Sequence, residues 1–295
     1  MFVWVNLPDA RDAVPLGRLV PAGEAGVPVH DRGLLLGDGL FETVRVARGA
    51  APLLDRHLER LRTGCRLIHM PLPMTDDELA EAAATLIKAN GLDDGYLRIT
   101  VTRGAGQRGY EAPLDPQPHV IMTAGPWQPP RDPMTVLPAT EPVLPHPVLS
   151  RVKHTSALSR VLLRTEARRR GAGEVILINT RGNLVEGVAT NLFWVREGTV
   201  YTPDLEQGPL PGIGRRFVLE TMPVVEGAFP PAVLTEADEV FLTNALLGPA
   251  AVAAMTASGP QPNGAGSEIQ FRWPAPGPVT TMLQEAWRRR LGLAG

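Results

Sequence analysis

The sequence has 295 residues, of which 44% are hydrophobic and 20% charged, a composition typical of soluble globular proteins. Its formal net charge of −2 offers no long-range attraction to nucleic acid or to an anionic membrane surface. No apolar run approaches the roughly 18 residues that a membrane span requires, and the lone cysteine, Cys65, excludes an internal disulfide. We therefore expect a cytoplasmic protein.

The first third of the chain mixes strand and helix patterns. Residues 41–46 alternate as in a strand, and apolar residues at helical spacing predict a helix over 54–69. Thr75 and Glu78 form a capping box that predicts a second helix, over 76–90, with Lys88 in its last turn. Two further strands are expected over 96–102 and 119–123.

A proline-rich segment, 125–133, predicts a linker because it can continue neither a helix nor a central strand. It separates a small N-terminal domain, 1–124, from a larger C-terminal domain, 134–295. In the larger domain we expect a helix over 158–170, then an antiparallel meander with strands over 174–179 and 192–195. A loop over 256–278 and a terminal helix from about Val279 follow. This order favours an α+β fold.

The use of lysine is the most informative local feature. Only Lys88 and Lys153 are lysines among the 29 basic residues. Arginine stays protonated, whereas a lysine whose pKa is lowered can form a Schiff base. Lys88 suits the end of its helix, but Lys153 precedes a helix, so the helix dipole does not explain it. The histidines and the cysteine lack zinc-site spacing, and the sequence contains neither G-x-S-x-G nor a P-loop.

Four segments in order resemble the class IV, or fold type IV, pyridoxal-phosphate enzymes. The resemblance runs from about residue 28 to 253, and the segments are 31–43 (DRGLLLGDGLFET), Lys153, 186–193 (EGVATNLF) and 212–215 (GIGR). It implies pyridoxal 5'-phosphate as cofactor, a two-domain fold like that of D-amino-acid aminotransferases, and a homodimer. A non-catalytic binding protein on this fold is the alternative, which the presence of Lys153 and Glu186 disfavours.

The resemblance also implies roles for individual residues. Lys153 would hold the cofactor aldehyde and carry protons, and Glu186 would keep the ring nitrogen protonated. Donors for the phosphate would be Arg60, the amides of Ile213 and Gly214, and the loop Thr243-Asn244. Many members of the family have threonine where this chain has Gly214, so only the backbone could serve at that position.

The resemblance also bears on the substrate. Residues 103–110 (RGAGQRGY) and the run from Thr243 to Leu246 resemble 4-amino-4-deoxychorismate lyases, which release 4-aminobenzoate and pyruvate in folate biosynthesis. Arg108 would hold a substrate carboxylate, with Tyr110 and Phe41 nearby, and the 104–112 loop could cross to a second subunit. A branched-chain or D-amino-acid aminotransferase is the alternative, because Tyr96 and Arg98 resemble a pair in branched-chain enzymes.

Overall fold

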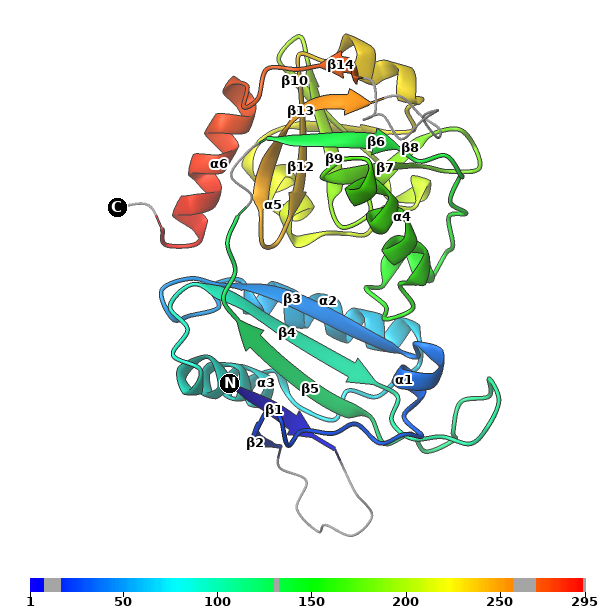
Figure 1. The fold of residues 1–295 in the computed structure, drawn as a ribbon, viewed down its shortest axis with the longest axis vertical. Coiled ribbons are helices and arrows are strands. Elements are labelled where there is room, and N and C mark those ends of the chain that lie inside the picture. The colour runs from blue at the N-terminus through cyan, green and yellow to red at the C-terminus, as the bar shows by residue number, and fades with distance from the viewer. Residues whose placement is uncertain (8–16, 130–132, 257–268, 294–295) are drawn as a thin grey trace.

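The computed structural model describes residues 1–7, 17–129, 133–256 and 269–293. Two sheets, one above the other in Figure 1, organise these residues. We propose that they correspond to the two predicted domains. β5, in the first sheet, extends through Gly125, one residue into the predicted linker. No helix in the described ranges is long and apolar enough to span a bilayer.

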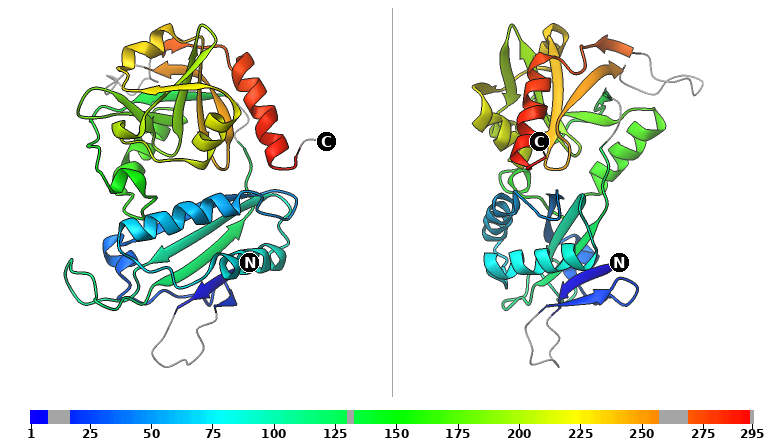
Figure 2. Two further views of the ribbon diagram at one scale, coloured as in Figure 1. Left: turned by 180° about the vertical axis from the view of Figure 1, so that it is seen from behind. Right: turned by 90° about the vertical axis from the view of Figure 1, so that its left-hand side faces the viewer.

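The first sheet is antiparallel throughout, in the order β2-β1-β5-β4-β3. Its strands are β1 (Phe2–Asn6), β2 (Arg18–Pro21), β3 (Gly39–Val46), β4 (Gly95–Thr102) and β5 (His119–Gly125). The short helix α1 (Arg32–Leu36) precedes β3, and the helices α2 (Leu54–Leu67) and α3 (Asp76–Ala89) cover one face of the sheet (Figure 2). The expected strands and helices of this region are therefore confirmed.

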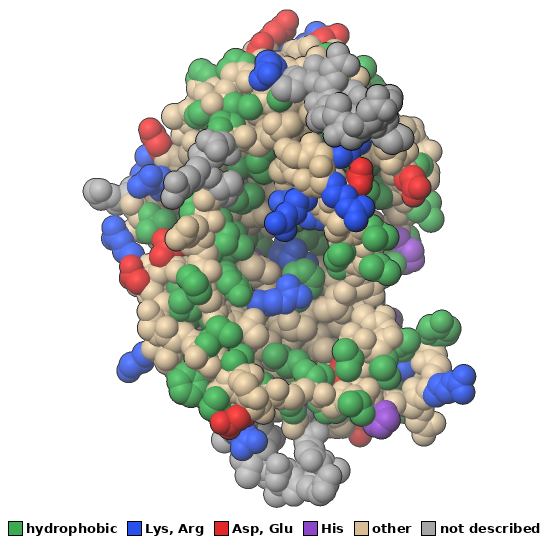
Figure 3. Space-filling model, in the orientation of Figure 1, with side chains coloured by type: hydrophobic (Ala, Val, Ile, Leu, Met, Phe, Trp, Pro, Cys, Tyr) green, Lys and Arg blue, Asp and Glu red, His purple; other side chains and the backbone are tan. Residues whose placement is uncertain are grey.

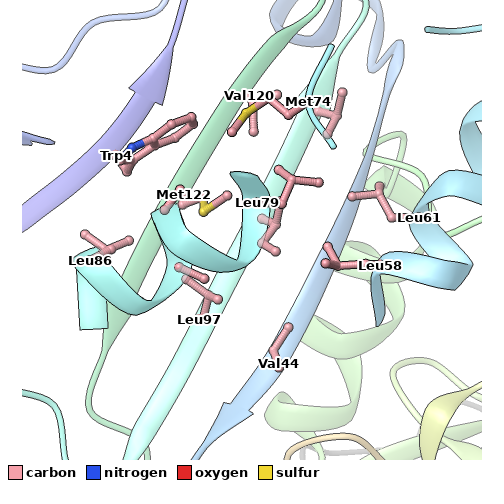
Figure 4. Packing of buried hydrophobic residues seen from close by; sticks show 14 of the residues in the cluster. Trp4, Val44, Leu58, Leu61, Met74, Leu79, Leu86, Leu97, Val120 and Met122 are labelled. Atoms are coloured by element: carbon pink, nitrogen blue, oxygen red, sulfur yellow. The ribbon is translucent and has the colours of Figure 1, made fainter. Parts of the chain in front are cut away.

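Alternating residues of the strands build the core beneath these helices. Val44 and Leu97 point toward Leu58 and Leu61 of α2 and toward Leu79 of α3, as Figure 4 shows. The Thr75–Glu78 capping box is present, with Glu78 N donating to Thr75 Oγ1 and Thr75 N donating to the Glu78 carboxylate. Lys88 lies in the last turn of α3, as its position predicted.

The second sheet has the order β11-β10-β9-β12-β13-β6-β7-β8, with β14 beside β13. Its strands are β6 (Met134–Pro138), β7 (Glu174–Ile178), β8 (Leu184–Gly187), β9 (Asn191–Arg196), β10 (Thr199–Pro203), β11 (Val224–Gly227), β12 (Glu239–Asn244), β13 (Gly248–Thr256) and β14 (Ile269–Arg272). The helices are α4 (Leu158–Arg169), α5 (Ile213–Thr221) and α6 (Pro278–Arg290), with 3-10 turns η1 (Leu149–Arg151), η2 (Leu205–Gln207) and η3 (Pro231–Glu236). α5 and α6 pack on one face through Phe217 and Trp287.

Two predictions for this region were wrong in part. The meander is interrupted, because β9 pairs with β12 and not with β8, and three strand pairs are parallel: β6–β7, β6–β13 and β10–β11. Parallel neighbours need a crossover, and α4 supplies it between β6 and β7. Part of the predicted 256–278 loop forms β14, because residues 269–272 pair with β13. Residues 257–268 lie outside the described ranges, and α6 confirms the terminal helix.

Candidate active site

Lys153 reaches the first sheet although it follows that sheet in sequence. Val152 is buried in the core of the first sheet. The Lys153 carbonyl accepts a hydrogen bond from Phe41 N at 2.8 Å, and Thr155 N donates to Gly39 O at 2.9 Å. The segment around Lys153 therefore pairs with β3 at the sheet edge. This pairing holds the Lys153 Nζ 4.6 Å from the centre of the Phe41 ring.

A cavity of about 570 Å³ surrounds this lysine. Figure 3 shows a hollow between the two halves of the molecule with Lys and Arg side chains gathered around it. Seven of the predicted site residues line the cavity: Phe41, Arg60, Lys153, Glu186, Ile213, Thr243 and Asn244. The structure thus brings residues from both sheets to one site, as expected for a bound small molecule.

The surroundings of Lys153 favour its neutral form. Burial, followed by the charge of Arg60, lowers the pKa of Lys153 to about 8, against the opposing effect of two carboxylates, Glu42 and Glu186. Near neutral pH a fraction of this lysine is therefore an unprotonated amine. Such an amine can attack a carbonyl group or accept a proton, whereas an ordinary surface lysine cannot do so efficiently.

Glu186 presents a buried carboxylate to the same cavity, and both of its oxygens have partners. Oε2 accepts from Asn191 Nδ2 at 3.2 Å and from the amide of Leu210 at 3.0 Å. Oε1 accepts from Arg160 of α4 at 2.7 Å. These donors fix the orientation of the carboxylate, so it is suited to accept a hydrogen bond from a protonated ring nitrogen.

Arg60 is held by a second buried carboxylate. Its guanidinium donates to both oxygens of Glu42, at 2.8 and 2.6 Å, and to Pro211 O at 3.1 Å. The same Glu42 contacts His57 Nδ1 at 2.6 Å. Burial alone would raise the pKa of Glu42, but Arg60 and His57 outweigh burial and lower it to about 2. The arginine is therefore fixed in place by a permanent anion.

The end of the cavity near α5 carries hydrogen-bond donors. α5 begins at Ile213, and its N-cap, Gly212, has no side-chain acceptor for the first amides. Thr243 Oγ1 is fully buried and has no hydrogen-bond partner among the described residues. A Cβ at Gly214 would lie 2.4 Å from that hydroxyl oxygen, so only glycine leaves the space for it. Free amides at a helix N-terminus, a guanidinium and a free hydroxyl together fit a phosphate group.

Asn244 contributes mainly to the shape of the loop that follows β12. Its Oδ1 accepts from the amides of Leu246 and Leu247, and its Nδ2 donates to Ala189 O. The side chain thus has partners within the protein. Its predicted contact with the cofactor stays a prediction.

The predicted substrate residues are not all in one place. Arg98 does not line the cavity, but its guanidinium lies 3.8 Å from the centre of the Phe41 ring. Arg108 and Tyr110 lie on the 104–112 loop, which projects from the first sheet, and Tyr110 is 91% exposed. Neither of these two residues lines the cavity of its own chain.

The projecting loop is nevertheless held firmly at its base. The buried Arg32 donates to the carbonyls of Gly109, Tyr110 and Glu111 at 3.1–3.2 Å, and to Asp38 at 2.8 Å. Arg32 N also donates to Gly104 O at 2.9 Å. The loop therefore has a defined shape before any substrate or partner binds.

Three residues of the site were not predicted from the sequence as site residues: Arg160, Asn191 and Glu42. Asn191 lies within the EGVATNLF segment, which was a usable signal. Arg160 and Glu186 are 26 residues apart and meet because α4 packs on β7, the neighbour of β8 in the sheet. Glu42 lies within the first matched segment, but its pairing with Arg60 needs the packing of α2 on β3.

Comparisons with known proteins find relatives over most of the chain. The model of the family described as amino-transferase class IV matches residues 39–255. A D-alanine aminotransferase from Bacillus licheniformis is 30% identical over 276 residues, which cover 92% of this chain and 93% of the relative. The structure of 4-amino-4-deoxychorismate lyase from Pseudomonas aeruginosa aligns with a TM-score of 0.77 and 33% identity, covering 91% of this chain and 96% of that one.

A third comparison includes a bound ligand. A structure of a branched-chain amino acid aminotransferase complexed with N-(5'-phosphopyridoxyl)-L-glutamate aligns with a TM-score of 0.82 and 25% identity. The alignment covers 99% of this chain and 95% of that one. Lyases and aminotransferases thus both resemble this chain, and the α+β, fold type IV architecture is confirmed.

Proposed function

This chain belongs to the amino-transferase class IV family, a family of pyridoxal-phosphate-dependent enzymes, and from that premise we propose that it is a 4-amino-4-deoxychorismate lyase. The observation that supports pyridoxal phosphate as the cofactor is that Lys153, Glu186 and the hydrogen-bond donors near α5 line one cavity. When bound, pyridoxal phosphate supplies an aldehyde that condenses with amines and a ring that withdraws electrons.

Each residue then has a defined task. Arg60, the first amides of α5 and the Thr243 hydroxyl hold the phosphate, while Glu186 accepts the ring N–H. Lys153, with its pKa lowered to about 8, removes a proton from the substrate carbon beside the amine. The ring C–O bond to the enolpyruvyl group then breaks, the departing enolpyruvate takes up a proton to become pyruvate, and the aromatic ring that remains is 4-aminobenzoate. The reaction needs no oxidant and no second substrate.

The 104–112 loop supports the lyase over the aminotransferase. Its residues 103–110 match the segment R-G-x-G-x-R-G-Y of the lyases, and Arg32 holds the loop in a defined shape. D-amino-acid aminotransferases usually carry tyrosine where this chain has Phe41 and histidine where it has Tyr110. Phe41 lacks the hydroxyl of that tyrosine, so it offers no hydrogen bond to a substrate carboxylate.

The aminotransferase stays the second candidate because of Arg98. This guanidinium is half-buried and stacks on Phe41, and its one hydrogen-bond partner in the described ranges is Thr100 Oγ1 at 3.3 Å. A half-buried cation without a carboxylate partner is suited to hold the distal carboxylate of 2-oxoglutarate. The same cation would also suit a carboxylate of aminodeoxychorismate.

One assay separates the two functions. The purified protein with pyridoxal phosphate is incubated with aminodeoxychorismate, and 4-aminobenzoate and pyruvate are measured by chromatography. In parallel, D-alanine or leucine is offered with 2-oxoglutarate, and glutamate formation is followed. We expect equimolar 4-aminobenzoate and pyruvate, abolished in Lys153→Ala. Glutamate formation without 4-aminobenzoate would assign the chain to the aminotransferases instead.

We also propose that two copies of the chain form the active enzyme, with the 104–112 loop of one subunit at the cavity of the other. The exposed Tyr110 and three exposed leucines of α1, Leu34, Leu35 and Leu36, support an interface on this side. The test is to mix inactive Lys153→Ala subunits with inactive Arg108→Ala subunits. Shared sites predict recovery of about a quarter of the wild-type activity, because half of the dimers are mixed and each has one intact site. No recovery would show that each chain uses its own loop.

A further inference from the structure

Glu186 has an unusual neighbour for a residue that is to bind a ring nitrogen. Its side chain is 4% exposed, and Oε1 accepts a 2.7 Å hydrogen bond from the guanidinium of Arg160. The other donors to this carboxylate, Asn191 and the amide of Leu210, are neutral. Arg160 is therefore the one charged group in the described ranges that donates a hydrogen bond to Glu186.

The guanidinium is held in place on the other side as well. Arg160 also donates to the carbonyls of Val188 and Gly187, the latter at 3.5 Å. It thus bridges α4 to the end of β8, and it lines the same cavity as Glu186 and Lys153. These hydrogen bonds hold its charge beside the carboxylate, although the side chain is 39% exposed.

We propose that Arg160 is a positioning residue that tunes how firmly Glu186 keeps the cofactor ring nitrogen protonated. This inference rests on the proposed function, because it requires the ring nitrogen to lie at Glu186. With the ring bound, a carboxylate would stand between two cations, the guanidinium and the protonated ring. Each cation weakens the hold of the carboxylate on the other, since like charges repel and share one counter-charge.

The remaining charges around Glu186 do not replace Arg160. Lys153 interacts electrostatically with Glu186, but within the described residues it donates no hydrogen bond to that carboxylate. Arg164, one turn further along α4, faces Glu174, whose oxygens accept from the amides of Val188 and Ala189. Arg160 is thus the fixed positive charge at the carboxylate. Its loss should raise the pH at which the ring nitrogen loses its proton.

The structure offers a charge-preserving variant, a neutral variant and a matched control. Arg160→Lys keeps the charge but loses the forked geometry, and Arg160→Gln keeps a donor but loses the charge. Arg164→Gln removes an arginine that lies one helical turn away and is more exposed, 52% against 39%, and whose ion pair is longer, 3.6 Å. Thermal unfolding of each variant establishes that it folds.

The measurement is the ¹⁵N chemical shift of ring-labelled pyridoxal phosphate bound to the protein, followed against pH. We expect Arg160→Gln to raise the pH at which the ring nitrogen loses its proton by about one unit, whereas Arg160→Lys and Arg164→Gln leave it unchanged. A purely structural role would lower stability in both Arg160 variants without this shift. An unchanged titration in Arg160→Gln would overturn the proposal.

Glu186→Gln separates this inference from the proposed function. If the ring nitrogen lies at Glu186, this variant must lower the pH at which the nitrogen loses its proton. A shift in Glu186→Gln but not in Arg160→Gln would refute the role of Arg160 alone. No shift in Glu186→Gln would refute the placement of the cofactor itself.

Discussion

Thr243→Val provides the sharpest test of the phosphate site, because it should stabilise the cofactor-free protein and weaken cofactor binding. The Thr243 hydroxyl is fully buried without a partner in the described ranges, and such a group costs about 1–3 kcal/mol. Valine keeps the shape of the side chain and removes that cost. We therefore expect the free energy of unfolding of the cofactor-free protein to rise by about 1 kcal/mol.

The effect on binding has the opposite sign. A hydrogen bond to a charged group contributes about 1.5–3 kcal/mol, and about 1.4 kcal/mol is a factor of ten. Losing the hydroxyl should therefore weaken cofactor affinity by about 10- to 100-fold. Pyridoxamine 5'-phosphate is the appropriate probe, because it cannot bond covalently to Lys153 and so reports the non-covalent contacts alone.

Urea unfolding of the cofactor-free protein and a fluorescence titration with pyridoxamine 5'-phosphate measure the two quantities. Thr256→Val is the matched control, because Thr256 Oγ1 is also buried without a partner among the described residues but does not line the cavity. The control should gain stability and keep its affinity. Wild-type affinity in Thr243→Val would show that the hydroxyl does not face the phosphate, and a loss of stability would show that it has a partner inside the protein.

Three further predictions concern charged residues. The pKa of Lys153 falls from an ordinary 10.5 to about 8, so its charge destabilises the fold fully below about pH 8 and less as pH rises toward 10.5. In urea unfolding, Lys153→Met should therefore stabilise the cofactor-free protein at pH 7 and progressively less toward pH 10. A difference in stability that does not depend on pH would contradict the pKa shift. Because the pKa of Glu42 is about 2, the stability that its charge contributes is complete above about pH 4.5 and is lost toward pH 2. Glu42→Gln should lower the free energy of unfolding by about 3–5 kcal/mol at pH 7 and by less at pH 3. An equal loss at both pH values would argue against an ionised pair. Arg32→Gln removes hydrogen bonds worth about 0.5–1.5 kcal/mol each, so the backbone amides of residues 105–111 should exchange with deuterium more than tenfold faster. In the same variant KM should rise more than kcat falls. Unchanged exchange would mean that the loop is held without the guanidinium.

Local signals in the sequence predicted the parts of the structure that depend on local physics. The capping box at Thr75 predicted α3, and the apolar spacing of 54–69 predicted α2, since caps and amphipathic faces act within one helix. The order of the second sheet was not predictable in this way. Whether β9 pairs with β8 or with β12 is decided by packing on both faces of the sheet, where Phe193 stacks on Phe241 at 5.1 Å.

In the site, too, residues within local motifs could be predicted from the sequence, whereas pairs that join distant elements could not. Lys153 and Glu186, which the structure brings to one cavity, could be proposed from the sequence because the chemistry restricts which residue types can serve, and because the motifs are contiguous in sequence. Arg160, which pairs with Glu186, and Glu42, which pairs with Arg60, were not predicted, because each pair joins different elements across 26 or 18 residues. The conformation of Arg98 likewise depends on Phe41, which lies on the neighbouring strand β3.

Two ion pairs that were not predicted lie on either side of Lys153, but neither is the main cause of its low pKa. Arg60–Glu42 lies on the side of the first sheet, and Arg160–Glu186 on the side of the second. Both arginines lower the pKa of Lys153 and both carboxylates raise it. Within each pair the two charges act in opposite directions, and burial is the largest single cause of the lowered pKa. Burial of the amine in the cavity between the two sheets therefore lowers its pKa more than any single neighbour does, and a lysine, unlike the surrounding arginines, can lose its proton there.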